Sequence, residues 1–495
     1  MKDLPSLAEA LEAYTRALPA GELLLFRDDG IDRIGVPVVA SSLRMENGPW
    51  ITSHGYGATE EEARVSAIGE LAEEVFAEKA LAERPRFHGS YVELVRQRGV
   101  QGVADPLTLG LPAGSPYHPD MPLTWLEMTR LSTGEPVLVP EEFVAIHPGQ
   151  LRGRAPLILP ITNGQGAGLS QPQALAHALL ELQQRDGNGL QFRAMDQGVV
   201  LDLEGASLPP DIQELLERYR RAGIEIIPKL ASTDFGLVNL YVVAQDPSPG
   251  EQPLMVTACG EAADPDRHRA LRKALLEYAG SRARKAFMHG PLEAVARVAP
   301  PGYLESFLPQ VNLRQEEPRA LQGMVEWASM PVGVLRALIA PTVQHRCTVR
   351  FTDLPEAAAA EAPPKRCAQV VEGLHQSGFD VLLIDLSPAD HSIHVVKALV
   401  PGLEVETMTY SRIGERNVAR LLARQDPLVG LGTPPEGAQR VRLTAAAEER
   451  LGGPAWFNVR LAEQRLGSLY SLYREPGRHS VQTVLRTRRF GGGLS

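Results

Sequence analysis

The feature that most constrains the fold is a twelve-residue segment that occurs three times in the chain. It reads ARVSAIGELAEE at 63–74, ALAHALLELQQR at 174–185 and ALRKALLEYAGS at 270–281. Alanine stands at the first and fifth positions of each copy and glutamate at the eighth, which gives Ala63, Ala67 and Glu70; Ala174, Ala178 and Glu181; Ala270, Ala274 and Glu277. Alanines four residues apart lie on one face of an α-helix and let it pack closely on a neighbour. The repeat therefore predicts three related helices.

A hairpin and a glycine-containing loop precede each predicted helix. Two apolar, β-branched runs around a turn predict hairpins at 34–55, 124–140 and 236–260. The loops are GYGAT at 55–59, NGQGAG at 163–168 and CGEAADP at 259–265. Glycine lets backbone N–H groups approach a ligand, and a helix N-terminus attracts anions. Hairpin, loop and helix form a repeated unit, and we expect the units to surround one shared cavity.

The repeated glutamates are the first candidate ligands. A carboxylate on or beside a packed helix face is either paired or bound to a cation. Glu73 follows Glu70 by one turn, a spacing that lets both share one hard cation. One glutamate on an alanine-rich helix is usually solvated, whereas three at the same place in three units indicate a common polar site. His54 and His177 lie beside it in sequence, and simple packing is the alternative role for both.

Composition excludes several classes of function. The formal net charge of −10 argues against a general nucleic-acid or anionic-membrane surface. The N-terminal sequence has no apolar stretch of signal-peptide length, and no run approaches a membrane span. The three cysteines form no close pair and have no metal-ligand spacing, as expected in a reducing compartment. These observations predict a cytoplasmic protein.

The length of 495 residues predicts more than one domain. We expect an N-terminal helical segment at 1–29, with a helix at 3–18, and a main domain at 30–425. Core units at 30–290 and a mixed α/β part at 291–425 make up that domain, and an extension covers 426–495. In the mixed part, FDVLLIDL at 379–386 predicts a buried strand, and HVVKALVPGLEVET at 394–407 predicts another strand that ends in a turn.

At these residues the chain resembles the YcaO family, over about residues 30–425. The segments that carry the resemblance occur in the family's order: GIDRIGVPV, SHGYGAT, NGQGAG with ELQQRD, ALRKALLEYAGSR and VVKALVPGLE. The resemblance implies an α+β, YcaO-like fold that buries ATP and Mg²⁺ in a pocket lined by glutamates. Members use ATP to phosphorylate a peptide-bond oxygen after a nucleophile has attacked the carbonyl. The products are azolines, thioamides or amidines, usually in ribosomally made peptides.

The resemblance also implies roles for single residues. The ATP contacts carried over are Ser66, Asn163, Arg185, Lys273 and Glu277. The Mg²⁺ ligands carried over are Glu70, Glu73, Glu181 and Glu277. No residue is assigned as the catalytic group, and Ser66 lacks a partnering base that would make it a nucleophile.

Five positions depart from the family pattern. Tyr56 replaces a lysine, Glu74 and Lys273 each replace an arginine, Gln184 replaces a glutamate and Gly280 a glutamine. The retained residues favour an ATP-dependent, cyclodehydratase-like enzyme acting on a peptide or protein. The departures favour a degenerate subunit that binds peptide or a partner without phosphoryl transfer. By resemblance we expect a homodimer or a heterodimer with a related chain.

Overall fold

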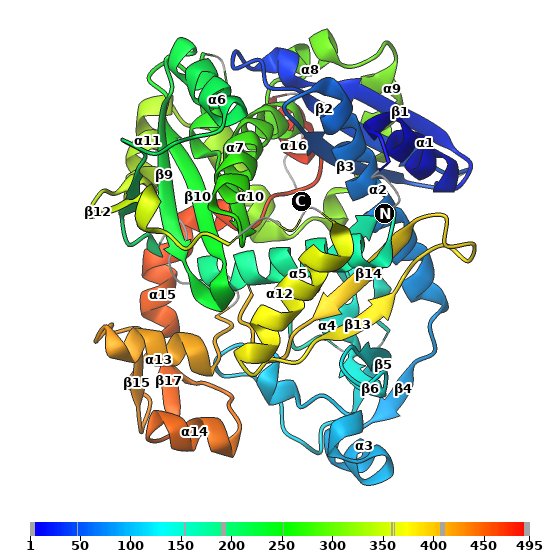
Figure 1. Ribbon diagram of the computed structural model, residues 1–495, viewed down its shortest axis with the longest axis vertical. Coiled ribbons are helices and arrows are strands. Elements are labelled where there is room, and N and C mark those ends of the chain that lie inside the picture. Colours follow the sequence, from blue (N-terminus) through cyan, green and yellow to red (C-terminus); the bar gives the residue numbers. More distant parts are fainter. Residues whose placement is uncertain are drawn as a thin grey trace. The chain divides into compact units, whose positions relative to one another are not determined.

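The structure is a computed structural model that describes residues 5–46, 48–152, 155–189, 195–250, 252–357, 360, 362–405 and 411–489 (Figure 1). The chain divides into two compact units, each built from separated stretches of sequence. Unit 1 comprises 1–72, 191–358 and 468–495, and unit 2 comprises 73–190 and 359–467. Within the described ranges, no helix combines enough length and apolarity to cross a membrane.

Unit 1 contains two sheets among its described residues. The smaller one is antiparallel, with the order β1 (Glu22–Arg27), β2 (Val38–Arg44) and β3 (Trp50–Tyr56). The larger one has the order β11 (Gly260–Asp264), β10 (Val238–Gln245), β9 (Glu225–Ser232), β8 (Val199–Asp202) and β12 (Cys347–Arg350). Strand β12 runs parallel to β8, and the other neighbours are antiparallel.

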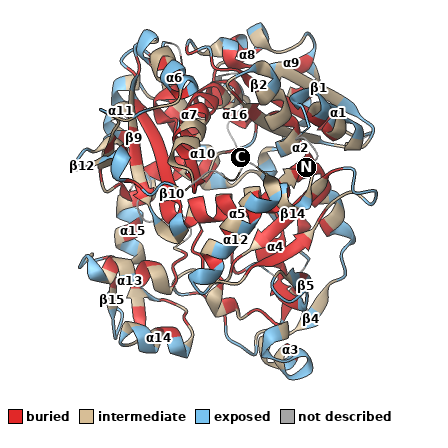
Figure 2. Ribbon diagram, in the orientation of Figure 1, coloured by how far each residue is buried: buried red, intermediate tan, exposed pale blue. Residues whose placement is uncertain are grey.

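The helices of unit 1 are α1 (Leu7–Ala17), the first half of α2 (Glu60–Glu83), α6 (Pro210–Arg221), α7 (Arg267–His289), α8 (Leu292–Val298), α9 (Tyr303–Phe307), α10 (Pro318–Ser329), α11 (Val332–Ile339) and α16 (Ser480–Arg489). Helix α7 begins at the cap residue Asp266, whose carboxylate accepts from the backbone N–H groups of His268 and Arg269. It packs on β10 and β11, and most of it is buried (Figure 2). Its apolar face joins Leu240 and Val242 in the core.

Unit 2 is built on a sheet with the order β4 (Phe87–Gly89), β5 (Leu123–Arg130), β13 (Leu382–Asp385), β14 (His394–Leu399) and β7 (Gln165–Gly168), with β6 (Pro136–Pro140) paired to β5. A smaller sheet has the order β15 (Val429–Leu431), β17 (Ala455–Phe457) and β16 (Gln439–Arg440). The helices are the second half of α2, α3 (Tyr91–Arg98), α4 (Glu141–Val144), α5 (Gln171–Asn188), α12 (Pro363–Gln376), α13 (Glu415–Ala423), α14 (Ala445–Leu451) and α15 (Val459–Leu466). Helix α5 lies against β7 and β14 (Figure 1).

The three repeated segments are helices, as predicted: they fall in α2, α5 and α7. The predicted hairpins also form, as the antiparallel pairs β2–β3, β5–β6 and β10–β11. The third hairpin differs from the prediction in its second strand. Residues Pro253–Thr257, expected to be part of that strand, form a 3-10 helix, and the strand that pairs with β10 is β11. Proline has no N–H to donate to a strand ladder, but it fits the first position of a helix. The strands predicted near residues 379 and 394 are β13 and β14.

The prediction of glycine loops was wrong in one respect. Much of each glycine segment is strand: Gly55 lies in β3, Gly166 in β7 and Gly260 in β11. A methyl group on Gly55 would lie 2.0 Å from the backbone N of Ala67, and one on Gly166 would lie 2.2 Å from the carbonyl of Ala174. These glycines therefore face the repeated alanines of the following helix, and they let strand and helix backbones touch.

Candidate functional site

Two of the predicted ligands in unit 1, Glu70 and Glu277, lie near the half-buried Tyr56. The hydroxyl of Tyr56, at the end of β3, donates a hydrogen bond of 2.9 Å to Oε2 of Glu277 on α7. Burial raises the pKa of Tyr56 well above its usual value, and the charges of Glu277, Glu70 and Glu261 raise it further. The phenol therefore keeps its proton near neutral pH. Glu277, Glu70 and the buried Glu261 of β11 form the acidic cluster of unit 1.

Two predicted nucleotide contacts flank these carboxylates on the same helices. Ser66 lies one turn before Glu70 on α2, and Lys273 lies one turn before Glu277 on α7. Both side chains are half-buried, whereas Glu70 is exposed. A hydroxyl and an ammonium one turn away from a carboxylate lie on the same helix face. In unit 1, Ser66 and Glu70 thus share one face of α2, and Lys273 and Glu277 share one face of α7.

Glu73 belongs to unit 2, because the boundary between the units falls inside α2. It is 7% exposed, and its Oε1 accepts a 2.7 Å hydrogen bond from the backbone N–H of Ala167. Nε2 of His177 on α5 lies 3.9 Å from the same oxygen. A hydrogen-bonded carboxylate beside an imidazole offers oxygen and nitrogen donors suited to a divalent cation. His177 thus lies near one of the candidate ligands, Glu73.

Glu181 is held at the start of the NGQGAG segment. Its Oε1 accepts a 3.2 Å hydrogen bond from the backbone N–H of Gly164, which has φ of +84°. The neighbouring Asn163 is 7% exposed, and its Nδ2 has no hydrogen-bond partner among the described residues. A buried amide donor costs free energy unless a ligand or water accepts from it. Asn163 and Glu181 therefore mark the part of unit 2 where a polar ligand is expected.

Sequence reasoning missed the buried cation of this region, Lys397 on β14. Its Nζ donates to the carbonyl of Ile161 at 2.6 Å and to that of Ala145 at 3.3 Å. Burial lowers the pKa of Lys397 to about 7, while the charges of Glu181 and Glu74 act in the opposite direction. A lone lysine inside the apolar run HVVKALV was the available signal.

Glu74 stands where the resemblance implies an arginine, and it lies within range of the same lysine. Burial raises the pKa of Glu74, and His147 and Lys397 lower it. The charge reversal at position 74 is thus partly compensated by a cation from a strand that lies far away in sequence.

Replacing Lys397 by methionine should lower the free energy of unfolding by about 1–3 kcal/mol, because two buried carbonyls lose their donor. The loss should grow as the pH rises above 7. A lowered lysine pKa makes the unfolded state bind more protons than the folded state between the two pKa values, so the wild type gains stability there and the variant does not. Urea denaturation at pH 7 and 9 measures both effects. The exposed Lys79→Met is the control, and a loss that stays equal at both pH values would contradict the assignment.

Gln184 and Arg185 lie on the last turns of α5, which a buried ionic cluster fixes. Asp186 is fully buried, accepts from the backbone N–H of Glu404 at 2.8 Å and pairs with Arg416 at 2.5 Å. Burial raises the pKa of Glu404 to about 7, although the N-terminus of α13 donates two backbone N–H groups to it. The segment VPGLE is therefore a structural anchor for the end of α5.

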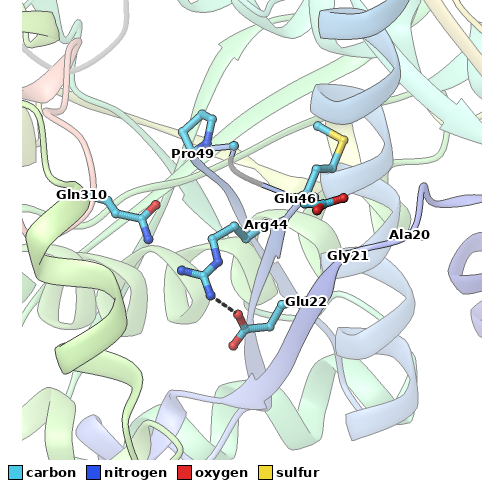
Figure 3. A pocket seen from close by; sticks show the side chains of 9 residues that line it. Ala20, Gly21, Glu22, Arg44, Glu46, Pro49 and Gln310 are labelled. Atoms are coloured by element: carbon cyan, nitrogen blue, oxygen red, sulfur yellow. Dashed lines mark hydrogen bonds and ion pairs between the residues drawn. The ribbon is translucent and has the colours of Figure 1, made fainter.

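A further pocket of unit 1 lies elsewhere. It has a volume of about 860 Å³ and is formed at the turn ends of β1, β2 and β3, with Gln310 on the far side (Figure 3). Arg44 and Glu22 form an ion pair within it, as the dashed line in Figure 3 shows. None of the predicted site residues lines this pocket.

The last stretch of unit 1 carries charged side chains into its interior. Arg478 is 5% exposed and donates to Oγ of Ser42 at 2.8 Å and to the carbonyl of Ser53 at 2.9 Å. Glu475 pairs with the buried Lys285 of α7 at 2.6 Å. Sequence reasoning did not foresee that this part of the predicted extension completes the core of unit 1.

Three histidines are buried around that stretch. Burial, followed by the positive charge of Arg478, holds the pKa of His54 and His479 well below the usual range, and burial also lowers that of His289. Burial raises the pKa of Asp28, which lies 3.1 Å from His54, to about 7. Of the two roles considered for His54, the packing role is the one observed.

The predicted ligands are thus divided between the units. Glu70 and Glu277 belong to unit 1, and Glu73 and Glu181 belong to unit 2. One cavity shared by all three glutamate-bearing helices stays a prediction. Glu261 was missed, although its place directly after Gly260 in an apolar run was a usable signal.

Comparison with known proteins identifies the family. Residues 54–404 match the family described as YcaO cyclodehydratase, ATP- and Mg²⁺-binding. The chain belongs to the YcaO family. An uncharacterised protein of Methanothermobacter thermautotrophicus is 29% identical over 391 residues, which cover 78% of this chain and 90% of that protein.

Two solved structures share the fold. The YcaO protein from Methanopyrus kandleri, bound with AMPPCP and Mg²⁺, is 23% identical, with a TM-score of 0.55 over 82% of this chain and 91% of that one. A heterocyclase in complex with substrate and cofactor is 16% identical, with a TM-score of 0.59 over 83% of this chain and 54% of that one. The α+β, YcaO-like fold expected from the sequence is therefore confirmed.

Proposed function

We propose that this YcaO protein is an enzyme that uses ATP and Mg²⁺ to activate backbone amides of a peptide or protein, leading to an azoline, a thioamide or an amidine. Membership of the family and the retained carboxylates support the proposal. When bound, ATP supplies the phosphoryl group that turns an amide oxygen into a leaving group, and Mg²⁺ neutralises the phosphate charge.

The donor set fits these two groups. Glu70, Glu73, Glu181 and Glu277 would hold Mg²⁺, because carboxylate oxygens are the ligands that this hard cation prefers. Ser66, Asn163, Arg185, Lys273 and Glu277 would contact the nucleotide. The cations among them suit phosphate oxygens, as ammonium and guanidinium groups do at other phosphate sites.

The observation that carries the proposal is the amide of Asn163. It is buried, its Nδ2 has no partner among the described residues, and the next residue along the chain donates to Glu181. A donor that is held next to an anchored carboxylate and left without an acceptor is suited to a phosphate oxygen. We therefore place the polar end of the nucleotide against Asn163.

Calorimetry with Mg-ATP tests the proposal. We expect binding by the wild type and a loss of at least about ten-fold in affinity in Glu181→Gln, because one ligand charge of a hard-cation site is removed. Asn163→Ala should weaken binding by about five-fold or more through the lost hydrogen bond. Glu449→Gln, an exposed change on α14 of the same unit, should bind like the wild type. Absence of Mg-ATP binding in the wild type would refute the enzyme assignment.

One observation favours a second candidate, the subunit without phosphoryl transfer. Gln184 is only 4% exposed, so an amide is buried where the resemblance implies a carboxylate. An amide brings no charge to a cation. If Mg-ATP binds only to Gln184→Glu combined with Glu74→Arg, the second candidate holds. In that case the chain would serve by binding peptide or an active partner, as a homodimer or a heterodimer.

A further inference from the structure

Two of the positions that depart from the family pattern touch each other inside unit 1. The ring of Tyr56 lies on Gly280 of α7: a methyl group on this glycine would be 2.7 Å from Cδ1 and 3.0 Å from Cγ of the ring. Carbon atoms in ordinary contact are about 3.5–4.0 Å apart. The ring therefore needs glycine at position 280, and each of the two departures has its physical reason in the other.

The same ring carries its hydroxyl to Glu277. Glu277 and Gly280 are one turn apart on α7 and so lie on one face of the helix. A ring seated on Gly280 spans that turn, and its hydroxyl donates to Oε2 of Glu277 at 2.9 Å. In this contact the phenol hydroxyl is the donor and the carboxylate is the acceptor.

The ring of Tyr56 is also held by packing against buried residues of α7. The core cluster to which Tyr56 packs contains the fully buried Ala274 and Tyr278 of α7. A side chain held by packing loses little further freedom when it makes its hydrogen bond. The position of the Glu277 carboxylate is thus set by a residue that lies 221 positions away in the sequence.

We propose that Tyr56 is a positioning residue that holds the Glu277 carboxylate in place, and that this role requires glycine at position 280. The inference rests on the proposed function, in which Glu277 is a ligand of the cation and the nucleotide. It assigns to a neutral phenol the place that the resemblance gives to a lysine. The pair Tyr56 and Gly280 then behaves as one unit, in which a change of either residue alone weakens the site.

The test measures binding of Mn²⁺ alone to the full chain, by electron paramagnetic resonance well below the unfolding temperature. Tyr56→Phe keeps the ring on Gly280 and removes only the hydroxyl. We expect it to weaken Mn²⁺ binding by about ten-fold, the usual effect of losing a group that orients a metal ligand. Gly280→Ala displaces the ring and should cause the same loss. The double variant should bind no more weakly than either single one.

Tyr219→Phe is the matched control. Tyr219 is a buried tyrosine of the core against which Tyr56 packs, and its hydroxyl donates to the carbonyl of Leu275 on α7 at 2.5 Å. Its loss should lower thermal stability and leave Mn²⁺ affinity unchanged, which separates positioning from a structural role. Wild-type affinity in Tyr56→Phe would overturn the inference, and tighter binding would overturn it by making the hydroxyl a competitor. Absence of Mn²⁺ binding in the wild type would instead defeat the proposed function, and the inference with it.

Discussion

Gly260→Ala is expected to lower the free energy of unfolding by about 4 kcal/mol, a large part of the total stability of a typical domain. A methyl group there would lie 2.0 Å from the carbonyl of Ala274 and 2.3 Å from the backbone N of Tyr278. Both atoms belong to the backbone of α7 and cannot rotate away. The strand or the helix must therefore shift, and either movement opens the core that α7 forms with β10 and β11.

Urea denaturation of Gly260→Ala and the wild type measures the effect. Gly333→Ala on α11 is the control, because no described atom other than the adjacent residues and the nearby backbone of its own helix lies within 4 Å of the added methyl group. We expect this variant to gain about 0.5 kcal/mol through reduced freedom of the unfolded chain. If the two variants unfold at the same urea concentration, the close contact between β11 and α7 is not what the repeat encodes.

Acidification from pH 7 to pH 5 is expected to destabilise unit 1. His54, His289 and His479 have lowered pKa values in the folded state, so below about pH 6.5 the unfolded state binds more protons and stability is lost. Asp28, with a raised pKa of about 7, opposes this by binding one extra proton in the folded state. Three lowered histidine pKa values act against one raised aspartate pKa, so the free energy of unfolding should fall between pH 7 and pH 5.

A variant isolates one member of this cluster. His479→Gln removes one buried titrating group. Between pH 7 and pH 5 the variant should therefore lose about 2 kcal/mol less of its free energy of unfolding than the wild type does. Urea denaturation at both pH values measures it. The exposed His118→Gln should show no such shift. A pH-independent difference for His479→Gln would show that this histidine is charged or solvated in the folded protein.

The sequence predicted the repeated elements because their pattern is local. Alanine at the first and fifth positions predicted a closely packed helix face, and in the structure Gly55 meets Ala67 and Gly166 meets Ala174. The third copy differs, since Gly260 meets Ala274 and Tyr278, one turn further along its helix. Such a register shift follows from which strand the helix lies on, and the repeat itself contains no sign of it.

The rest of the candidate site depends on contacts between distant residues. The bond from Tyr56 to Glu277 joins residues 221 positions apart, and Lys397 donates to the carbonyl of Ile161 across 236 positions. Periodicity along one segment carries no information about such pairs. The separation of the chain into discontinuous units has the same origin, because it depends on which strands pair and which helices cover them.

The placement of Glu475 and Arg478 has a consequence for how the protein is made. A ribosome completes all of unit 2 before it synthesises the stretch that fills the interior of unit 1. During most of translation, Lys285 and Ser42 therefore lack their partners Glu475 and Arg478, and the histidines around them lack the same stretch. Domains usually fold as units during synthesis, at about 5–20 residues per second. Unit 1 cannot follow that order, because its first two stretches must stay soluble on the nascent chain until the third is made. A stop codon shortly before Glu475 should therefore yield a product that chaperones bind and proteases degrade.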